Sequence, residues 1–154
     1  MPPSRDKVTV VIPTLNEAQA IGKVIDEVLA EGYTNILVVD GHSTDGTPEI
    51  AAAKGAKVIQ QEGTGKADAI KTAVKHVKTP YMLVIDGDYT YPPKEIHKLL
   101  HKIETNDLVI GARTYGRQNI PLLNRVGNWI ITKTFNLLFG TKLTDVCSGM
   151  YIIK

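Results

Sequence analysis

The sequence predicts an α/β protein with a mainly parallel central sheet and helices on both faces of that sheet. Short apolar, β-branched runs alternate with segments of helical periodicity along the chain, which is the pattern of strand–helix–strand units. The composition agrees, because 154 residues of which 43% are hydrophobic and 22% charged are enough for one globular domain with its own core. We therefore expect a single three-layer α/β/α domain over residues 1–154.

Five runs are expected to form the strands. Each is short, almost entirely apolar and followed by a polar or glycine-rich loop, as strands buried on both faces are. They are Val8–Ile12, Ile36–Val39, Lys57–Ile59, Met82–Ile85 and Leu108–Ile110. Because ligands of open α/β sheets bind beyond the carboxyl ends of the strands, we expect function in the five loops that follow these runs.

Three segments between the runs repeat apolar residues at i, i+3, i+4 and i+7, the spacing of one helix face. These sets are Ile21, Val24, Ile25 and Val28; Ile70, Ala73, Val74 and Val77; and Ile96, Leu99, Leu100 and Ile103. The stretch 121–140 also fits a helix, and it is apolar over a broad face that carries Trp129, with Arg125 and Lys133 nearby. Two interpretations of it stay open: an ordinary core-packing helix, or one that rests in a bilayer interface.

Charge and cysteine content exclude several classes of protein. A net charge of +2 and a pI near 8.6 are too mild to indicate a nucleic-acid partner. The single cysteine, Cys147, excludes an internal disulfide framework and suits a reducing compartment. We see neither an apolar run that would span a membrane nor the core of a signal peptide near Met1. We therefore expect a cytoplasmic protein, at most peripheral at the membrane face.

The loop after the fourth strand carries Asp86, Gly87 and Asp88. Two carboxylates two residues apart at the end of a strand point to the same side, and Gly87 lets a ligand approach closely. Such oxygen ligands suit Mg²⁺ or Mn²⁺, which usually bind few protein groups together with phosphate oxygens. The alternative is a helix cap ahead of Pro92 and Pro93, which explains one carboxylate but not both.

The loops after the first two strands offer contacts for a nucleoside. Pro13 and Leu15 can lie against a base, and Glu17 falls in the first turn of the next helix. Asp40 can accept hydrogen bonds from a base N–H or a ribose hydroxyl. For residues 45–47 we favour the simpler role of capping the helix that follows.

The loops after the third and fifth strands carry basic residues suited to phosphate. Gly65 and Lys66 can meet a phosphate at a helix start, although the full phosphate-loop pattern is missing because Ala67 replaces Ser or Thr. Arg113, with Arg117 in the same loop, can bind phosphate through paired N–H donors or simply be a solvated basic group. The absence of a Gly-x-Gly-x-x-Gly motif after the first strand disfavours a dinucleotide-dependent oxidoreductase.

Taken together, these loops resemble those of family 2 glycosyltransferases with the GT-A fold, above all the dolichyl-phosphate mannosyltransferase type. The motifs that carry the resemblance run in order along nearly the whole chain: VIPTLNE at 11–17, VVD at 38–40, STDGT at 43–47, GKA at 65–67, DGD at 86–88 with Pro92 and Pro93, GAR at 111–113 and DVCSG at 145–149.

The resemblance implies roles for individual residues. Asp86 and Asp88 would bind a divalent metal on the diphosphate of a nucleotide-sugar, with Gly87 between them. Pro13, Leu15, Glu17, Asp40 and Lys66 would contact the nucleotide-sugar. Arg113, Arg125 and Ser148 would face the acceptor phosphate, so that the catalytic set is Asp86, Asp88 and Arg113. Relatives of this type continue beyond the position of Lys154, so we expect the elements that close their acceptor side to be missing here.

The substrates follow from the resemblance only in outline. Gly41 stands where many relatives carry a second Asp, and Thr90 stands where mannosyltransferases often carry Gln. GDP-mannose and a UDP-sugar therefore both stay open as donors, with mannose favoured. The expected acceptor is dolichyl or polyprenyl phosphate, with a glycan hydroxyl as the alternative for a glucose or GlcNAc donor.

The acceptor determines what chemistry the site must supply. A phosphate monoester already carries about 1.5 to 2 negative charges near neutral pH, so it can attack the anomeric carbon without a general base. This favours a direct, inverting displacement in which cations offset the negative charges of the acceptor phosphate and the leaving diphosphate. The competing hypotheses are a shortened nucleotide-sugar-binding module without activity of its own, and a nucleotidyltransferase, whose glycine-rich basic first loop is absent from 13–17.

Overall fold

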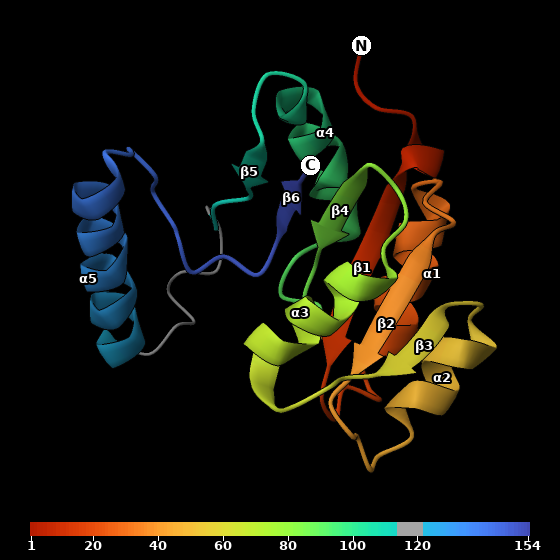
Figure 1. The fold of residues 1–154 in the computed structure, drawn as a ribbon. Helices are drawn as coiled ribbons and strands as arrows, with labels where there is room; N and C mark the ends of the chain where they lie inside the picture. Colours follow the sequence, from red (N-terminus) through yellow and green to blue (C-terminus); the bar gives the residue numbers. More distant parts are fainter. Residues whose placement is uncertain (114–121) are drawn as a thin grey trace.

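The computed structural model describes residues 1–113 and 122–154. A six-stranded sheet forms its centre, with the strand order β3-β2-β1-β4-β6-β5 (Figure 1). The strands are β1 (Val8–Thr14), β2 (Ile36–Asp40), β3 (Lys57–Gln60), β4 (Tyr81–Val84), β5 (Leu108–Ile110) and β6 (Tyr151–Ile153). All five expected strands are therefore present, with ends shifted by at most two residues.

The sheet is mainly parallel, as expected, with one exception. β1 pairs in parallel with β2 and β4, and β2 pairs in parallel with β3. β6 lies between β4 and β5 and is antiparallel to both. The sequence did not single out β6, because three residues are too few to display a periodicity. Its direction brings the preceding residues, 145–150, to the same edge of the sheet as the carboxyl ends of the parallel strands.

Helices cover both faces of the sheet, so the three-layer α/β/α arrangement is confirmed (Figure 1). One core contains residues of α1, α2 and α4, and the other, on the opposite face, contains residues of α3. The helices are α1 (Ile21–Ala30), α2 (Thr47–Ala53), α3 (Gly65–His76), α4 (Ile96–Ile103) and α5 (Leu122–Phe139), with short 3-10 helices at Arg5–Lys7 and Pro93–Glu95.

The expected apolar stripes of α1 and α4 are both buried. The stripe expected for α3 is only partly right, because its buried residues are Ala69, Thr72 and Ala73, whereas Val74 is 59% exposed. Thr72 tolerates burial because its hydroxyl donates to the Asp68 carbonyl and accepts the N–H of Glu62. Small residues on this face let the helix lie close to the sheet.

The expectation that every strand is buried on both faces is wrong for the two edge strands. β1 and β2 are almost completely buried. In β3 the terminal residues Lys57 and Gln60 are exposed, and in β5 Leu108 is 47% exposed. The reason is topological, since an edge strand lacks a neighbour on one side and its helices cover it less completely.

α5 stands apart from the three layers (Figure 1). Only Thr132 of this helix is buried, and Leu122, Leu123, Leu137 and Leu138 are each more than 70% exposed. Within the described residues, α5 is therefore not a core-packing helix. Among the helices of residues 1–113 and 122–154, none combines the length and the apolar character that crossing a bilayer requires.

Replacing a valine by alanine at one buried and one exposed helix position tests which helix faces are buried. Val24 on α1 is fully buried and Val74 on α3 is 59% exposed. We expect Val24→Ala to lower the free energy of unfolding by about 2 kcal/mol, because it removes buried methyl groups and leaves a cavity. Val74→Ala should change it by less than about 0.5 kcal/mol. Urea denaturation measures both, and equal losses would contradict the assignment of the buried faces.

Candidate active site

The Asp86 carboxylate at the carboxyl edge of the sheet is held between Lys66 and Gly149. It follows β4, and one of its oxygens accepts a hydrogen bond from Nζ of Lys66, at the start of α3. On its other side lies Gly149, where an added Cβ would stand only 1.7 Å from Oδ2 of Asp86. Any side chain at position 149 would therefore displace this carboxylate. The segment before β6 thus completes the site around a residue that follows β4.

Asp88 is exposed, and its Oδ1 accepts the N–H of Thr90 at 2.9 Å. Gly87, between the two aspartates, is packed against β1, where an added Cβ would lie 2.9 Å from Cγ2 of Thr14. Glycine is thus needed for the close approach of this loop to the first strand, which holds the two flanking carboxylates at the edge of the sheet.

The residue after Asp88 has a strained backbone. Tyr89 adopts a φ of 63°, a left-handed conformation that a bulky residue rarely takes. Two contacts with α1 hold its side chain: Tyr89 Oη donates to Glu27 Oε1 at 2.5 Å, and Lys23 Nζ lies 3.7 Å from the ring centre. Strain retained at such a position is typical of a functional loop.

Several carboxylates lie close to Glu17 at the carboxyl edge of the sheet. Partial burial raises the pKa of its carboxyl group, and the charges of Asp88, Asp45 and Asp86 raise it further. Asp86 and Asp88 thus both act on the same neighbouring group. In the described part of the chain no three His, Cys, Asp or Glu side chains are arranged to hold a metal ion together. The donor set of Asp86 and Asp88 fits a hard cation such as Mg²⁺ or Mn²⁺ that takes its remaining oxygens from a ligand.

Asp40 does not lie open to a ligand, contrary to the direct nucleoside contact that we expected. It is fully buried at the end of β2. Its Oδ1 accepts from the hydroxyls of Thr14 (3.2 Å) and Ser43 (2.6 Å), and its Oδ2 accepts the Ser43 N–H (2.9 Å). These bonds satisfy the carboxylate internally, so Asp40 fixes the loop after β2, and a direct contact with a nucleoside requires this network to open.

Residues 45–47 tie the first two loops together. Asp45 accepts the N–H of Thr47 at 3.1 Å through Oδ1 and the N–H of Ala18 at 3.0 Å through Oδ2. These bonds, with one from the Thr47 hydroxyl as the strongest influence, lower the pKa of Asp45. The Thr47 hydroxyl in turn accepts the N–H of Glu17 at 2.8 Å. The capping role that we favoured for this segment is only partly right: Asp45 accepts the N–H of the first residue of α2, but Gly46 stands at the N-cap and has no side chain to cap with.

A pocket of about 390 Å³ opens between the loops after β1, β2 and β3. Pro13, Leu15 and Ala69 give it apolar walls, and Lys66 and Asp86 line it as charged groups. Four of the residues predicted to contact a nucleotide-sugar, Pro13, Leu15, Lys66 and Asp86, thus line one cavity. Its size and its mixed lining suit a base with an attached phosphate group.

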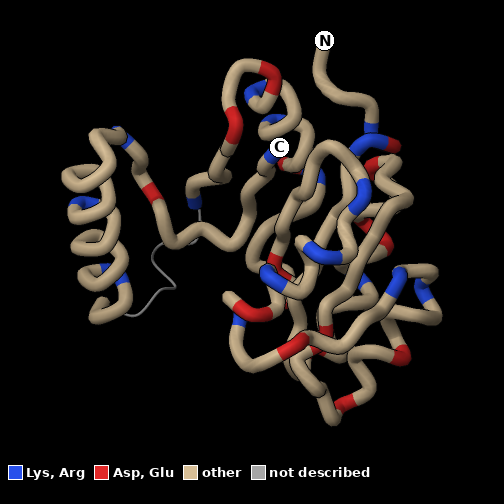
Figure 2. Tube along the Cα trace, viewed as in Figure 1, with Lys and Arg blue, Asp and Glu red and all other residues tan. Residues whose placement is uncertain are grey.

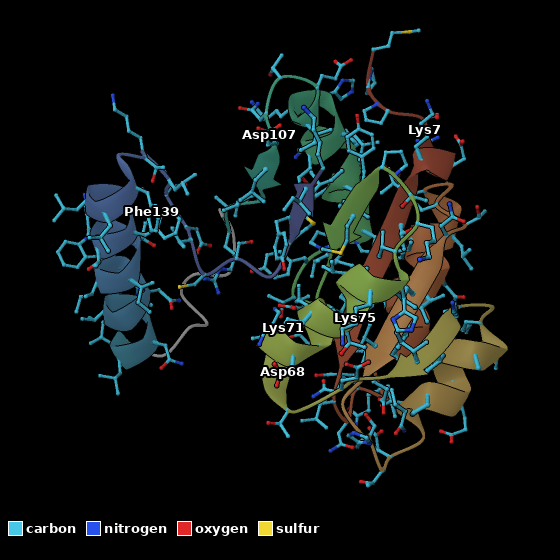
Figure 3. The ribbon with its side chains drawn as sticks, in the orientation of Figure 1. Lys7, Asp68, Lys71, Lys75, Asp107 and Phe139 are labelled. Carbon is cyan, nitrogen blue, oxygen red and sulfur yellow. The ribbon has the colours of Figure 1, made fainter. Side chains whose placement is uncertain are left out.

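The third loop is shaped by Asp68 on α3. Asp68 Oδ2 accepts the N–H of Thr64 at 3.1 Å, and Oδ1 accepts from Lys71 Nζ at 2.9 Å (Figure 3 labels Asp68 and Lys71). Gly63 packs against the same carboxylate, with an added Cβ only 2.4 Å from Oδ2. The loop that carries Lys66 is therefore built by side-chain contacts rather than by a phosphate-loop motif.

Arg113, which the sequence predicts to bind phosphate, instead forms an ion pair with Asp145. Its Nε and Nη2 donate to the two carboxylate oxygens at 2.7 and 2.9 Å, and its side chain is only 19% exposed. The hydrogen bonds to Asp145 raise the pKa of the guanidinium above its ordinary value. The pair joins the end of β5 to the segment before β6. Arg117 lies outside the described residues.

Ser148 and Tyr91 also hold the segment before β6. The Ser148 hydroxyl is buried and donates to the carbonyl of Gly111 at 2.5 Å, so it is not presented to an acceptor as we expected. Tyr91, only 5% exposed, accepts the N–H of Gly149 at 2.7 Å through its hydroxyl oxygen. Sequence reasoning missed Tyr91, and its position between the aspartates and the two prolines is the only local signal for it.

A second pocket of about 580 Å³ lies between α5 and the segment 143–145. Its lining combines the cations Arg113, Arg125 and Lys133 with Trp129 and Val126. Asn136 anchors the far end of α5 here, because its amide donates to the Leu143 carbonyl at 2.8 Å. An amphiphilic anion is the kind of ligand that such a lining suits.

Comparison with known proteins identifies the class. The model of the family "Glycosyl transferase family 2" matches residues 9–154, so the chain belongs to that family. The chain is 43% identical over 151 residues to the glycosyltransferase AglJ of Haloferax volcanii. The alignment covers 96% of this chain and 50% of AglJ. The chain is 39% identical over 149 residues to a dolichyl-phosphate hexose transferase of the same organism, over 94% of this chain and 65% of that protein.

Solved structures agree on the fold. The glucosyl-3-phosphoglycerate synthase of Mycobacterium tuberculosis, in complex with Mn²⁺, UDP-glucose and phosphoglyceric acid, superposes with a TM-score of 0.79 at 25% identity. The match covers 96% of this chain and 56% of that one. The expected GT-A fold is therefore confirmed. The chain spans about half to two-thirds of the length of these proteins.

The raised pKa of Glu17 predicts a pH-dependent effect on stability. A carboxyl group whose pKa is raised on folding destabilises the folded state at pH values where it is ionised, and this penalty disappears as falling pH protonates it. We expect Glu17→Gln to raise the Tm of the metal-free protein at pH 7 and to leave it nearly unchanged at pH 4. Thermal unfolding measures this, and a lower Tm at pH 7 would contradict the crowding of carboxylates.

Proposed function

We propose that this chain binds a nucleoside-diphosphate sugar and transfers the sugar, with mannose favoured, to a polyprenyl phosphate such as dolichyl phosphate. The observation that carries the proposal is the pair Asp86 and Asp88, of which Asp86 binds Lys66 and lines a pocket that is large enough for a nucleotide. The family membership and the relative that acts as a dolichyl-phosphate hexose transferase support it.

The donor would lie with its base in the 390 Å³ pocket, against Pro13 and Leu15, and its diphosphate beside Lys66 and Asp86. Asp86 and Asp88 would hold Mg²⁺ or Mn²⁺, which when bound offsets the negative charge that grows on a leaving diphosphate. Lys66 pairs with Asp86 through a side chain that is 49% exposed, so its ammonium group can also contact a phosphate oxygen without losing this partner.

The acceptor phosphate would enter the pocket beside α5, where Arg125 and Lys133 supply positive charge. Its oxygen attacks the anomeric carbon from the face opposite the diphosphate, the bond to the diphosphate oxygen breaks, and the configuration inverts. No protein group needs to remove a proton, because the attacking phosphate is already ionised. Arg113 would act from its ion pair with Asp145, positioning the segment that lines the pocket beside α5.

A lipid carrier also requires access to a membrane surface, and α5 offers one. Its exposed leucines lie on a helix whose only charged residues are Arg125 and Lys133, without any acidic group (Figure 2). Apolar residues together with positive charge favour binding to an anionic bilayer interface. We therefore propose that α5 lies at the membrane face, on the cytoplasmic side where nucleotide-sugars are expected.

The structural neighbour favours a second candidate donor. That neighbour was crystallised with UDP-glucose and Mn²⁺, so UDP-glucose is the alternative to GDP-mannose. Incubation of the protein with Mn²⁺, labelled GDP-mannose or UDP-glucose, and polyprenyl phosphate tests both donors. Labelled lipid supports transfer and identifies the donor. Donor binding without a labelled lipid would overturn transfer by this chain alone, and release of the labelled sugar 1-phosphate would indicate transfer of the nucleotidyl group instead.

The metal role of Asp88 gives a direct prediction. We expect Asp88→Ala to lower Mn²⁺-dependent transfer by at least about 100-fold, because the metal loses one of its two carboxylate ligands. Among the residues that the structure describes, the exposed Asp88 has no structural partner beyond the N–H of Thr90, so the Tm should change little. Asp107→Ala, at a carboxylate that is 96% exposed in a remote loop, is the matched control and should keep full activity. Wild-type rates in Asp88→Ala would refute the role.

The membrane role of α5 predicts selective flotation with liposomes. We expect the protein to float with vesicles that contain anionic lipid and much less with purely zwitterionic ones. Leu137→Glu with Leu138→Glu, at side chains 85% and 72% exposed, should abolish flotation without changing the Tm. Val74→Glu with Ala52→Glu, which adds the same two negative charges at exposed neutral positions of α3 and α2, serves as the control. Equal flotation of all variants would contradict an interfacial role for this helix.

A further inference from the structure

Gln61 is a buried polar side chain that the proposed mechanism does not use. It directly follows β3, it is only 9% exposed, and it lines the 390 Å³ pocket. Its backbone N–H donates to the Asp40 carbonyl at 2.9 Å, which continues the pairing of β3 with β2. Each polar atom of a buried amide normally has a hydrogen-bond partner in the protein or in water, so both Oε1 and Nε2 of Gln61 need one.

The orientation of the Gln61 amide is fixed by one hydrogen bond. Nε2 donates to the carbonyl oxygen of Gly63 at 3.1 Å. A carbonyl can only accept, so the NH₂ group must face Gly63 and the oxygen Oε1 must face away from it. In the structure Oε1 lies 3.2 Å from the position that a Cβ on Gly41 would take, and Gly41 is also part of the pocket lining.

Within the described part of the chain, Oε1 of Gln61 is an acceptor without a protein donor. Across residues 1–113 and 122–154, no hydrogen bond reaches it, and no fully buried side-chain oxygen or nitrogen lacks a partner. Oε1 therefore keeps its contact with the solvent of the pocket. A ligand that fills the pocket removes this solvent, and unless it brings an N–H group it leaves a desolvated acceptor, which is costly.

We infer that Gln61 selects the nucleobase of the donor, and this inference rests on the proposed function. Oε1 would accept a hydrogen bond from the ring N–H of a keto base, which is N3–H in uracil or N1–H in guanine. Cytosine and adenine carry a lone pair at the corresponding ring nitrogen and would oppose Oε1 with a second acceptor. A site built around one such hydrogen bond rejects ligands that cannot form it.

Gly41 preserves the space that this contact needs. An added Cβ there would lie 3.1 Å from the Thr14 carbonyl oxygen and 3.2 Å from Oε1 of Gln61. A side chain at position 41 would therefore press on the amide oxygen or cover it. Because position 41 is a glycine, Oε1 of Gln61 faces an open part of the pocket.

Base-modified nucleotides separate this role from a purely structural one. Calorimetric titration of the full chain with Mn²⁺ compares UDP, GDP, CDP and ADP with N3-methyl-UDP and N1-methyl-GDP. We expect UDP or GDP to bind at least about tenfold more tightly than its methylated form and than CDP or ADP, the effect of one buried hydrogen bond. Which of the two keto bases binds identifies the base of the donor.

The variant Gln61→Met keeps the size of the side chain and removes its acceptor. It should reduce the affinity for the preferred nucleotide to that for its methylated form, whereas Gln60→Met, at the exposed neighbouring glutamine, should leave the difference intact. Equal binding of methylated and unmethylated nucleotides to the wild type, or full discrimination by Gln61→Met, would overturn the inference and leave the proposed function standing. Failure of every nucleotide to bind would overturn both.

Discussion

The placement of the Asp86 carboxylate is the constraint on which the rest of the site depends. One oxygen is bonded to the Lys66 ammonium group, and the other lies against Gly149, where a Cβ would clash at 1.7 Å. This arrangement requires the antiparallel strand β6, because only a strand of reversed direction brings residues 145–149 to the carboxyl ends of β4 and β5. The insertion of β6 into an otherwise parallel sheet is thus the step that assembles the site.

Electrostatics explain why this edge of the sheet suits a cation and a diphosphate together. Glu17, Asp45, Asp86 and Asp88 lie close enough that three of them raise the pKa of the fourth, Glu17. Lys66 offsets part of this charge through Asp86. A divalent cation would offset more of it, and a diphosphate would then bring negative charge to the cation and to Lys66. The site is therefore best balanced when metal and nucleotide bind together.

Two pockets of different character lie near this edge. The one beside Pro13 and Leu15 suits a nucleotide, and the one beside α5 combines arginine and lysine with Trp129. The Arg113–Asp145 ion pair joins β5 to the segment that lines the second pocket, and Asn136 joins α5 to the same segment. In the inverting displacement that we propose, such a division would keep the attacking acceptor and the leaving diphosphate on opposite sides of the anomeric carbon.

The sequence by itself determined the elements and the chemistry that local patterns encode. Strands β1 to β5, the buried faces of α1 and α4 and the Asp86–Gly87–Asp88 loop follow from periodicity and from residue types within a few positions of one another. Tertiary structure alone decided which groups meet: Asp40 is buried against Thr14, Arg113 is held by Asp145, and Gln61 faces the space left by Gly41. The physical reason is that these contacts join residues 20 to 32 positions apart, whose approach depends on strand order and direction, and neither is encoded in any short segment of the chain.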